Sequence, residues 1–346
     1  MKHFYHLIWR FCFVLLLAVL GSCAQNSQNI FPLEQVYLSP QSLATTLTAM
    51  QRDHSDLCSL HLLGFSSVEE IPIQALKIGS GAQKALVIGQ HHGDEVLGIE
   101  VAMQIAQELT DGSELSQRIL RHYEVWIVPT MNPEGWKIVR SGVYQWKRKN
   151  NRDTNGNGSL DIRDDGVDLN RNYPVFWEQD KLVTVSDPFF KGRTPASEAE
   201  TQAIIALAER VRFDLAVFYH SSSTGIYSEK IFMPAYDRAN AEQAAAIEEL
   251  SQSVELYASQ VKKDYAKSGY DVAQGMSSSV GNARNYFFHS FGTKAFLVEI
   301  GGKNQAGSSI VHPPARIMQQ NRMQHSRAFL NLLYNSIISH PDEGTQ

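Results

Sequence analysis

Cysteine is scarce in this sequence: 346 residues contain three. Cys12 falls in an apolar stretch near the N-terminus, Cys23 follows that stretch, and Cys58 lies in the body of the chain. If the stretch is removed on export and Cys23 is modified, Cys58 has no partner for an internal disulfide. The mature domain then has to take its stability from a hydrophobic core.

The long hydrophobic run of the chain, residues 11–20, follows two basic residues and ends just before Cys23. These features are typical of a signal peptide, and the run is too short to span a bilayer stably. Leu20-Gly21-Ser22 before Cys23 resembles the lipobox of bacterial lipoproteins, which implies cleavage before Cys23 and lipidation of its thiol. No aspartate follows to favour inner-membrane retention, so we expect an exported lipoprotein anchored to the outer membrane and facing the periplasm. The alternative is an ordinary cleaved signal with an incidental cysteine.

An excess of positive charge is lacking as well: the formal net charge is −5, and no basic stripe stands out. A nucleic-acid partner is therefore not expected. The hydrophobic fraction of 43% and the charged fraction of 19% are those of an ordinary globular protein. We expect a signal peptide over residues 1–22, a polar tether over 23–39, one folded domain over 40–338 and a short tail over 339–346.

Apolar strands alternate with helical segments along this domain. Strands are predicted over residues 58–65, 71–78, 85–89, 124–128, 215–219 and 295–299, and helices over 42–52, 96–109, 197–212, 240–266 and 313–336. The alternation predicts an α/β fold, a single doubly wound domain whose mixed central β-sheet has helices on both faces. Residues 129–195 show little periodicity and form too long a segment to be an idle connection, so we expect function there.

Two histidines and a glutamate are candidates for a metal site. A buried apolar strand leads into residues 90–95, and open α/β sheets carry their sites at the carboxyl ends of such strands. His92 and Glu95 have His-x-x-Glu spacing, and an imidazole with a carboxylate suits zinc. His220 also ends an apolar strand and is the natural third ligand, which leaves the fourth position of a catalytic zinc open. His91 is a rival of His92 but lacks a glutamate three places further on, and any one of these histidines could instead be a hydrogen-bonded loop residue.

A carboxylate and two cationic segments could complete a hydrolytic site. Glu299 ends the strand 295–299; near a metal-activated water it would be a general base, and elsewhere a structural ion-pair partner. Arg148 could stabilise a developing oxyanion, although a basic run such as Lys147-Arg148-Lys149 is more often a solvated surface loop. Asn170 and Arg171 place an amide beside a guanidinium, which can bind a planar carboxylate bidentately.

In combination, these motifs resemble the zinc carboxypeptidases of the carboxypeptidase A/B type, the funnelin metallocarboxypeptidases. The matching segments occur in family order: His92-Gly93-Asp94-Glu95, Asn132-Pro133-Glu134-Gly135, Arg148-Lys149-Asn150, Asp168-Leu169-Asn170-Arg171-Asn172, Ser197-Glu198, His220-Ser221 and Glu299. Each motif is weak by itself, whereas the ordered set is specific. The resemblance implies a catalytic Zn²⁺ bound by the two histidines and Glu95, with Glu299 as general base. It also implies that Arg148 polarises the scissile carbonyl, while Asn170 and Arg171 hold the C-terminal carboxylate of a peptide.

Two positions depart from the family pattern. The usual arginine inside His-x-x-Glu is Asp94 here, as in bacterial branches that include cell-wall peptide amidases. The tyrosine that closes over substrate would fall near Ser277, where the sequence has none. These departures concern the substrate more than hydrolysis, so a murein stem peptide is the alternative to an ordinary peptide. A binding protein with a dead site on this fold is disfavoured, because every expected ligand and the base are present.

Arg284 is the candidate for choosing the C-terminal residue. In the resembling family, a residue shortly before the general base, in a loop of the form Gly-x-x-x-Asp, sets the character of the pocket for that side chain. A buried guanidinium without a partner is costly, whereas a substrate carboxylate could pair with it. We therefore predict a preference for acidic C-terminal residues. If Arg284 points to solvent or pairs internally, with Asp271 as a candidate partner, the pocket is apolar instead.

A separate signal for calcium lies in residues 153–164. Oxygen-bearing side chains fall at loop positions 1, 3, 5, 9 and 12, with glycine at the sixth, as in an EF-hand. The candidate Ca²⁺ ligands are Asp153, Asn155, Asn157, Ser159, Asp161 and Asp164. Position 12 is Asp rather than Glu, and no flanking helix pair is evident, so a cluster of Gly and Asn turns is the alternative.

Overall fold

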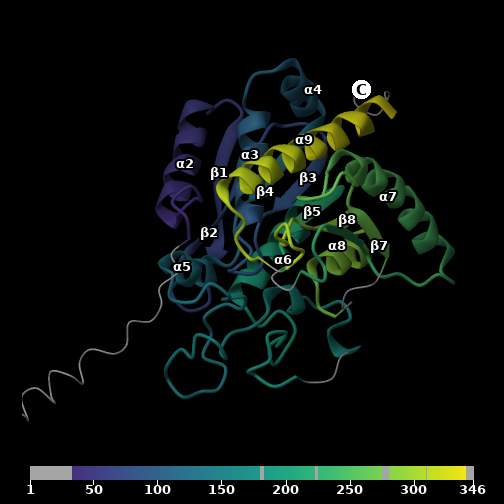
Figure 1. Cartoon of the computed structure of the whole chain (residues 1–346). Coiled ribbons are helices and arrows are strands. Elements are labelled where there is room, and N and C mark those ends of the chain that lie inside the picture. Colours follow the sequence, from purple (N-terminus) through teal and green to yellow (C-terminus); the bar gives the residue numbers. More distant parts are fainter. Residues whose placement is uncertain (1–32, 180–182, 223–224, 275–279, 309, 340–346) are drawn as a thin grey trace, which may run out of the picture.

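An eight-stranded mixed β-sheet forms the centre of the computed structural model, which describes residues 33–179, 183–222, 225–274, 280–308 and 310–339 (Figure 1). The strands are Cys58–Phe65 (β1), Pro72–Ile78 (β2), Gln83–Ile88 (β3), Tyr123–Val128 (β4), Leu215–His220 (β5), Lys230–Met233 (β6), Asp271–Gln274 (β7) and Lys294–Glu299 (β8). Their order in the sheet is β1-β2-β4-β3-β5-β8-β6-β7. The four central strands β4, β3, β5 and β8 are mutually parallel, whereas β2 and β6 pair antiparallel with β4 and β8. This arrangement confirms the predicted mixed sheet.

Helices pack on both faces of this sheet (Figure 1). They are Pro40–Asp53 (α2), Leu97–Leu109 (α3), Glu114–His122 (α4), Pro133–Ser141 (α5), Ala199–Val211 (α6), Ala241–Gln260 (α7), Ala283–Phe291 (α8) and Ala315–Ser339 (α9). One hydrophobic core contains side chains of α3, α4, α7 and α9, and a second contains side chains of α6 and α8. The doubly wound α/β fold is therefore confirmed.

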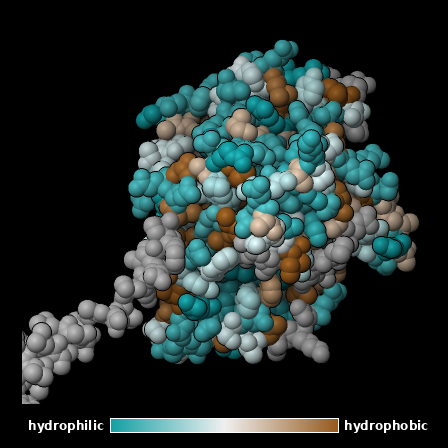
Figure 2. Space-filling view, viewed as in Figure 1, coloured by the Kyte–Doolittle hydropathy of each residue, from teal (hydrophilic) through white to brown (hydrophobic). Residues whose placement is uncertain are grey.

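Strand β3 shows why the central strands are apolar without alternation. Ala85 and Val87 pack into the core under α3 and α9, while Leu86 and Ile88 pack into the core under α6 and α8. All four side chains are fully buried. Because both faces of a parallel sheet are covered, both sets of side chains have to be apolar. On the face of the molecule seen in Figure 2, apolar side chains are scattered among hydrophilic ones.

Several elements differ from their prediction. The helix predicted over residues 240–266 ends at Gln260, because Val261 is extended and fully buried. The last helix runs from Ala315 to Ser339 rather than over 313–336. Strands β6 and β7 and helices α4, α5 and α8 were not predicted.

The segment predicted as a tether is packed against the domain from Leu33 onward. Leu33 and Tyr37 are buried in the hydrophobic core, and the Tyr37 hydroxyl donates a hydrogen bond to the carbonyl of Pro313. The backbone N–H of Leu38 donates to the Glu100 carboxylate at 2.7 Å. The predicted signal peptide, Cys23 and residues 340–346 lie outside the described residues. The helices of the described part are too short or too polar to cross a membrane.

Candidate active site

Three adjacent parallel strands deliver the predicted site residues to one edge of the sheet. Residues 90–95 follow β3, His220 ends β5, and Glu299 ends β8. In the β5–β8 register, His220 lies directly beside Glu299. The long segment between α5 and α6, teal in Figure 1, contributes Arg148, whose Nη1 lies 3.1 Å from His92 Nδ1. The predicted location at the carboxyl ends of the strands is therefore correct.

Glycine is required where the loop after β3 meets its neighbours. A Cβ on Gly93 would lie 2.6 Å from the Cα of Gly135 and 2.7 Å from the carbonyl oxygen of Lys147. A Cβ on Gly98, at the start of α3, would lie 1.5 Å from the carbonyl oxygen of Gly89. These close backbone contacts fix the loop that carries His92 and Glu95.

His92, Glu95 and His220 form a buried cluster of potential metal ligands. Their ligand atoms all lie within 4.8 Å of one another. His92 Nδ1 is 2.9 Å from Glu95 Oε1, His220 Nδ1 is 2.7 Å from Glu95 Oε2, and the two Nδ1 atoms are 3.1 Å apart. The ligand atoms of a tetrahedral zinc lie about 3.3 Å apart, so the cluster needs only small outward shifts to accept one. Two imidazoles and one carboxylate also form the donor set that suits zinc.

The electrostatics of the cluster also fit a cation. Burial and Arg148 act to lower the pKa of His92, but Glu95 and Asp168 outweigh them and raise it to about 9. Burial and then Glu95 raise the pKa of Asp94 to about 7 and that of Glu299 to about 8. The carboxylates around His92 thus favour a positive charge among the three ligand atoms, and a divalent cation there would take the place of the proton on His92.

Asp168 orients His92, a role that the sequence did not reveal. Its Oδ1 lies 3.0 Å from His92 Nε2, which leaves Nδ1 facing the cluster. Its Oδ2 accepts hydrogen bonds from Arg148 Nε at 3.0 Å and from Nη2 at 2.8 Å. Burial acts to raise the pKa of Asp168, but Arg148 and His92 hold it well below its usual value. Because metal-binding histidines commonly donate their second N–H to a carboxylate, this rule could have prompted a search for such a partner.

The basic run around Arg148 is buried rather than solvated. Lys147 donates to the carbonyl of Asp165, and Lys149 donates to the carbonyls of three residues, Asp164, Val185 and Asp187. Arg148 Nη1 lies 3.1 Å from His92 Nδ1 and 3.4 Å from Glu95 Oε1. The two lysines therefore tie the long segment together, and the arginine between them is directed at the ligand cluster.

Asn170 and Arg171 belong to a short 3-10 turn that ends beside His220. The Asp168 carboxylate caps this turn by accepting from the backbone N–H of Asn170 at 2.9 Å. Asn170 Nδ2 lies 3.3 Å from His220 Nε2, and its Oδ1 accepts from the N–H of Ala283. Arg171 Nη1 donates to the carbonyl of Asn170 at 2.7 Å. The predicted amide and guanidinium thus lie next to the ligand cluster.

Glu299 has an unpaired oxygen in this site. Its Oε2 is buried and has no hydrogen-bond partner among the described residues. The raised pKa of its carboxyl group, about 8, follows from burial and from Glu95. An unpaired carboxylate oxygen beside a metal-ligand cluster is available to a water molecule or a substrate.

Arg284 is buried within α8 and does not point to solvent. The residue is 2% exposed, and its Nε donates a hydrogen bond to the carbonyl of Met233 at 3.1 Å. Burial and then Arg171 lower the pKa of Arg284 to about 9, while Glu299 acts in the opposite direction. Asp271, the partner considered from the sequence, forms an ion pair with Lys263 at 2.9 Å instead. The position expected for the family tyrosine, residue 277, lies outside the described residues.

The predicted calcium loop is held by hydrogen bonds among its own residues. Asp153 accepts from the N–H groups of Gly156 and Gly158, both of which have positive φ. Asn155 and Asn157 both donate side-chain N–H groups to Asp161 Oδ2. Within the described residues, three or more acidic, His or Cys ligand atoms come together in the His92 cluster and not in this loop. The structure therefore gives calcium no support here.

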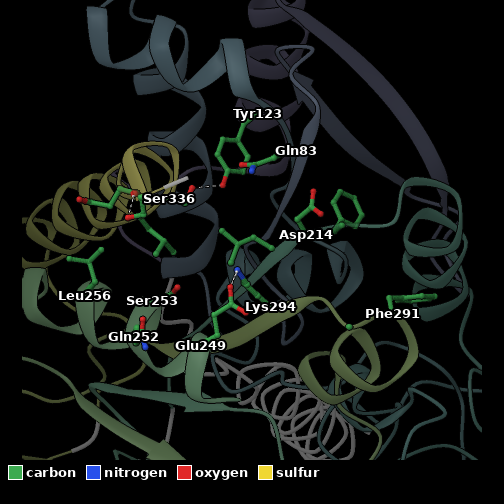
Figure 3. Close-up of a pocket in the computed structure, with 16 residues that line it drawn as sticks. Gln83, Tyr123, Asp214, Glu249, Gln252, Ser253, Leu256, Phe291, Lys294 and Ser336 are labelled. Carbon is green, nitrogen blue, oxygen red and sulfur yellow. Dashed lines mark hydrogen bonds and ion pairs between the residues drawn. The ribbon is translucent and has the colours of Figure 1, made fainter. Parts of the chain in front are cut away.

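A cavity of about 510 Å³ lies at the opposite edge of the sheet (Figure 3). It is lined by the first residues of β3, β5 and β8, among them Gln83, Leu215 and Lys294. Lys294 and Glu249 form an ion pair across this region at 2.6 Å. Because the ligand cluster follows the other ends of the same strands, this cavity is separate from the candidate active site.

A buried His–Glu–His cluster with a carboxylate beside it, at the carboxyl ends of parallel strands, is typical of zinc-dependent hydrolases. The chain belongs to the Peptidase M14 family of zinc carboxypeptidases, whose sequence model matches residues 43–325. The metallocarboxypeptidase A-like protein of Trichophyton verrucosum is 26% identical over 249 residues, which cover 69% of this chain and 55% of that protein. The carboxypeptidase N catalytic chain of Rattus norvegicus is 30% identical over 148 residues, which cover 39% of this chain and 30% of that protein. The chain thus spans about half or less of the length of these curated relatives.

Solved structures agree on the fold. The carboxypeptidase A of Helicoverpa armigera superposes with a TM-score of 0.73 at 17% sequence identity, over 93% of this chain and 79% of the other. At this identity the likeness concerns the fold alone. The assignment of individual site residues therefore depends on the geometry described above.

Proposed function

We propose that this protein is a zinc-dependent metallocarboxypeptidase that hydrolyses the C-terminal peptide bond of a peptide. One observation carries the proposal: the three potential zinc ligands, the Glu299 carboxylate and two arginines converge at one edge of the sheet. Family membership and the names of the relatives support the same activity.

Zinc fits the ligand cluster, and the chain's own residues define what it would do there. A zinc ion held by His92, Glu95 and His220 would act as a Lewis acid, which polarises the scissile carbonyl and lowers the pKa of the attacking water. Asp168 keeps the Nδ1 atom of His92 directed at the ion by bonding to Nε2.

Glu299 acts as the general base in this proposal. Its carboxylate takes a proton from the attacking water and gives that proton to the amine that leaves. Its buried Oε2, which has no hydrogen-bond partner among the described residues, supports this role because the oxygen is accessible to a proton without breaking a bond to the protein.

Two arginines position the substrate. Arg148, whose Nη1 is 3.1 Å from His92 Nδ1, stabilises negative charge that develops on the scissile carbonyl oxygen. Arg171 and Asn170 bind the terminal carboxylate, which restricts cleavage to the last residue of the chain. This division of roles is that of the carboxypeptidase A/B type.

The acidic preference assigned to Arg284 is part of the proposal. Its burial and its electrostatic interaction with Arg171 and Glu299 support a place next to the C-terminal residue. We expect peptides ending in Glu to be cleaved faster than those ending in Phe or Lys, and Arg284→Ala to abolish that ranking. The exposed Arg327 of α9 provides a control, because Arg327→Ala should leave the ranking unchanged. A wild type that prefers Phe would remove Arg284 from the pocket.

One assay separates the proposed substrate from its alternatives. The purified, zinc-loaded chain is incubated with a peptide library varied at the C-terminus and with murein fragments, and products are followed by mass spectrometry. Loss of single C-terminal residues from ordinary peptides is the expected result. Cleavage confined to murein fragments would favour a murein-peptide amidase or carboxypeptidase, and no cleavage of either would favour a binding protein.

Export and anchoring through Cys23 complete the proposal, supported by the order of basic, apolar and small residues before that cysteine. Expression in a bacterial host with a labelled fatty acid should label the wild type and not Cys23→Ala. Equal labelling of the two proteins would refute lipidation at this thiol.

A further inference from the structure

Phe189 is an exposed aromatic residue that contacts both substrate arginines. Its side chain is 46% exposed. The Cζ atom of Arg148 lies 5.2 Å from the centroid of its ring, and that of Arg171 lies 5.5 Å away. Cations within about 6 Å of an aromatic ring are attracted by its quadrupole. A single ring therefore interacts with the two guanidinium groups to which the proposed function assigns the scissile carbonyl and the terminal carboxylate of the substrate.

The turn that carries Phe189 is fixed on both sides. Asp187 Oδ1 accepts from the N–H of Phe189 at 2.7 Å, and the Asp187 carbonyl accepts from the N–H of Phe190 at 3.1 Å. The carbonyl of Phe190 accepts from the N–H of Asp168 at 2.8 Å, and the Phe190 side chain is buried. Lys149 also donates to the Asp187 carbonyl. The backbone that holds Phe189 is thus bonded to the same segments that carry Arg148 and the partner of His92.

Exposure alone would not distinguish Phe189, because single apolar residues are common on protein surfaces. Contact with two arginine side chains at once distinguishes Phe189 from such scattered surface residues. Arg148 and Arg171 carry like charges, so their guanidinium groups repel each other. A ring in contact with both guanidinium groups offsets this repulsion and restricts their movement.

We propose that Phe189 is a positioning residue for Arg148 and Arg171 and forms an apolar wall along the C-terminal residue of the substrate. The inference rests on the proposed function, in which one guanidinium meets the scissile carbonyl and the other meets the terminal carboxylate. The scissile carbonyl belongs to the penultimate residue and is bonded to the nitrogen of the C-terminal residue, whose other end carries the carboxylate, so the two groups flank the C-terminal residue. The ring that touches both guanidinium groups therefore lies alongside that residue.

Steady-state kinetics of the zinc-loaded full chain on a peptide substrate test this role. Phe189→Ala should raise KM and lower kcat/KM about tenfold, the effect of losing two cation–π contacts. Phe189→Tyr should restore both values because the ring remains, whereas Phe189→Leu should not. Phe65 is a matched control: it is also 46% exposed but lies on the edge strand β1, so Phe65→Ala should change neither value.

The separate values of KM and kcat distinguish positioning from a structural role. Simple loss of folded protein lowers the apparent kcat and leaves KM unchanged. A double-mutant cycle adds a second criterion, since Phe189→Ala should raise KM less than twofold when Arg171→Ala is already present.

Each result has a defined consequence. An unchanged KM in Phe189→Ala, or full activity of Phe189→Leu, would overturn the inference while leaving the proposed function intact. A wild type that releases no C-terminal residue would instead refute the proposed function, and this inference with it.

Discussion

Replacing Asp168 with asparagine should weaken zinc binding while preserving the shape of the site. The carboxylate makes four hydrogen bonds: Oδ1 to His92 Nε2 and the Asn170 N–H, and Oδ2 to two nitrogens of Arg148. If the single oxygen of asparagine keeps the Oδ1 position, its NH₂ group faces the two N–H donors of the guanidinium. If the amide is reversed, the NH₂ group faces His92, which favours the wrong tautomer for a ligand at Nδ1.

The size of the effect follows from this geometry. Loss of the carboxylate partner of a metal-bound histidine commonly lowers metal affinity about 10- to 100-fold, which corresponds to about 1.4–2.8 kcal/mol. Arg148 would also lose its partner in a buried ion pair, so the free energy of unfolding should fall by about 3–5 kcal/mol.

Competition with a chelator measures the zinc dissociation constant, and denaturant titration measures the free energy of unfolding. Asp165→Asn is the matched control, because Asp165 is equally buried in the same segment but accepts hydrogen bonds from Thr154 and Asp161. The control should lower stability and leave zinc affinity unchanged. Wild-type zinc affinity in Asp168→Asn would refute the reasoning, as would an equal loss in the control.

Four further predictions concern the metal, the base, the calcium loop and pH. His220→Ala should lose most of its bound zinc and nearly all hydrolysis while remaining folded; full zinc occupancy by metal analysis would show that the third ligand is wrongly assigned. Glu299→Gln should retain zinc but lower kcat by roughly 10²–10⁴-fold, and near wild-type turnover would remove its role as base. If residues 153–164 bind calcium, adding Ca²⁺ to a chelator-treated, zinc-replete sample should raise Tm, and an unchanged Tm would favour the turn cluster. Burial lowers the pKa of His325 from 6.5 to about 3, so the stability that its neutral form contributes is lost as pH falls below 6.5. At pH 5 this loss is about 2 kcal/mol. In urea titrations, the free energy of unfolding of His325→Gln should therefore decrease less between pH 7 and pH 5 than that of the wild type.

The strand ends of the candidate site could be predicted because they follow from local sequence. A run of apolar residues predicts a buried parallel strand, and a polar residue directly after it must lie at the carboxyl edge of the sheet. His92, His220 and Glu299 were found in this way, and strand order then brings them together. The fold class could be predicted for the same reason.

The partners contributed by the long segment could not be derived from its sequence. Asp168 meets His92 across 76 residues of sequence, where the long segment is tied by hydrogen bonds of Lys147 and Lys149 to distant main-chain carbonyls, and the residue pattern of the segment does not show these pairings. Helix α5 is a different case, since Asn132 caps its start and Gly142 ends it in the left-handed region. Those capping signals were present in the sequence, but the polar composition around them obscured the helix.

The lysine anchors of the long segment have a consequence for sequence variation. Lys147 and Lys149 bond to main-chain carbonyls of Asp164, Asp165, Val185 and Asp187, and a carbonyl is supplied by any amino acid. Substitutions at Asp164 and Val185 can therefore accumulate among descendants of this protein without releasing the segment, whereas Asp165 and Asp187 also accept hydrogen bonds with their side chains. The partner of Arg148 cannot be exchanged in this way, because it is the side-chain carboxylate of Asp168. Mutation can thus remodel the outer surface of this segment while the lysines and the arginine beneath it stay the same.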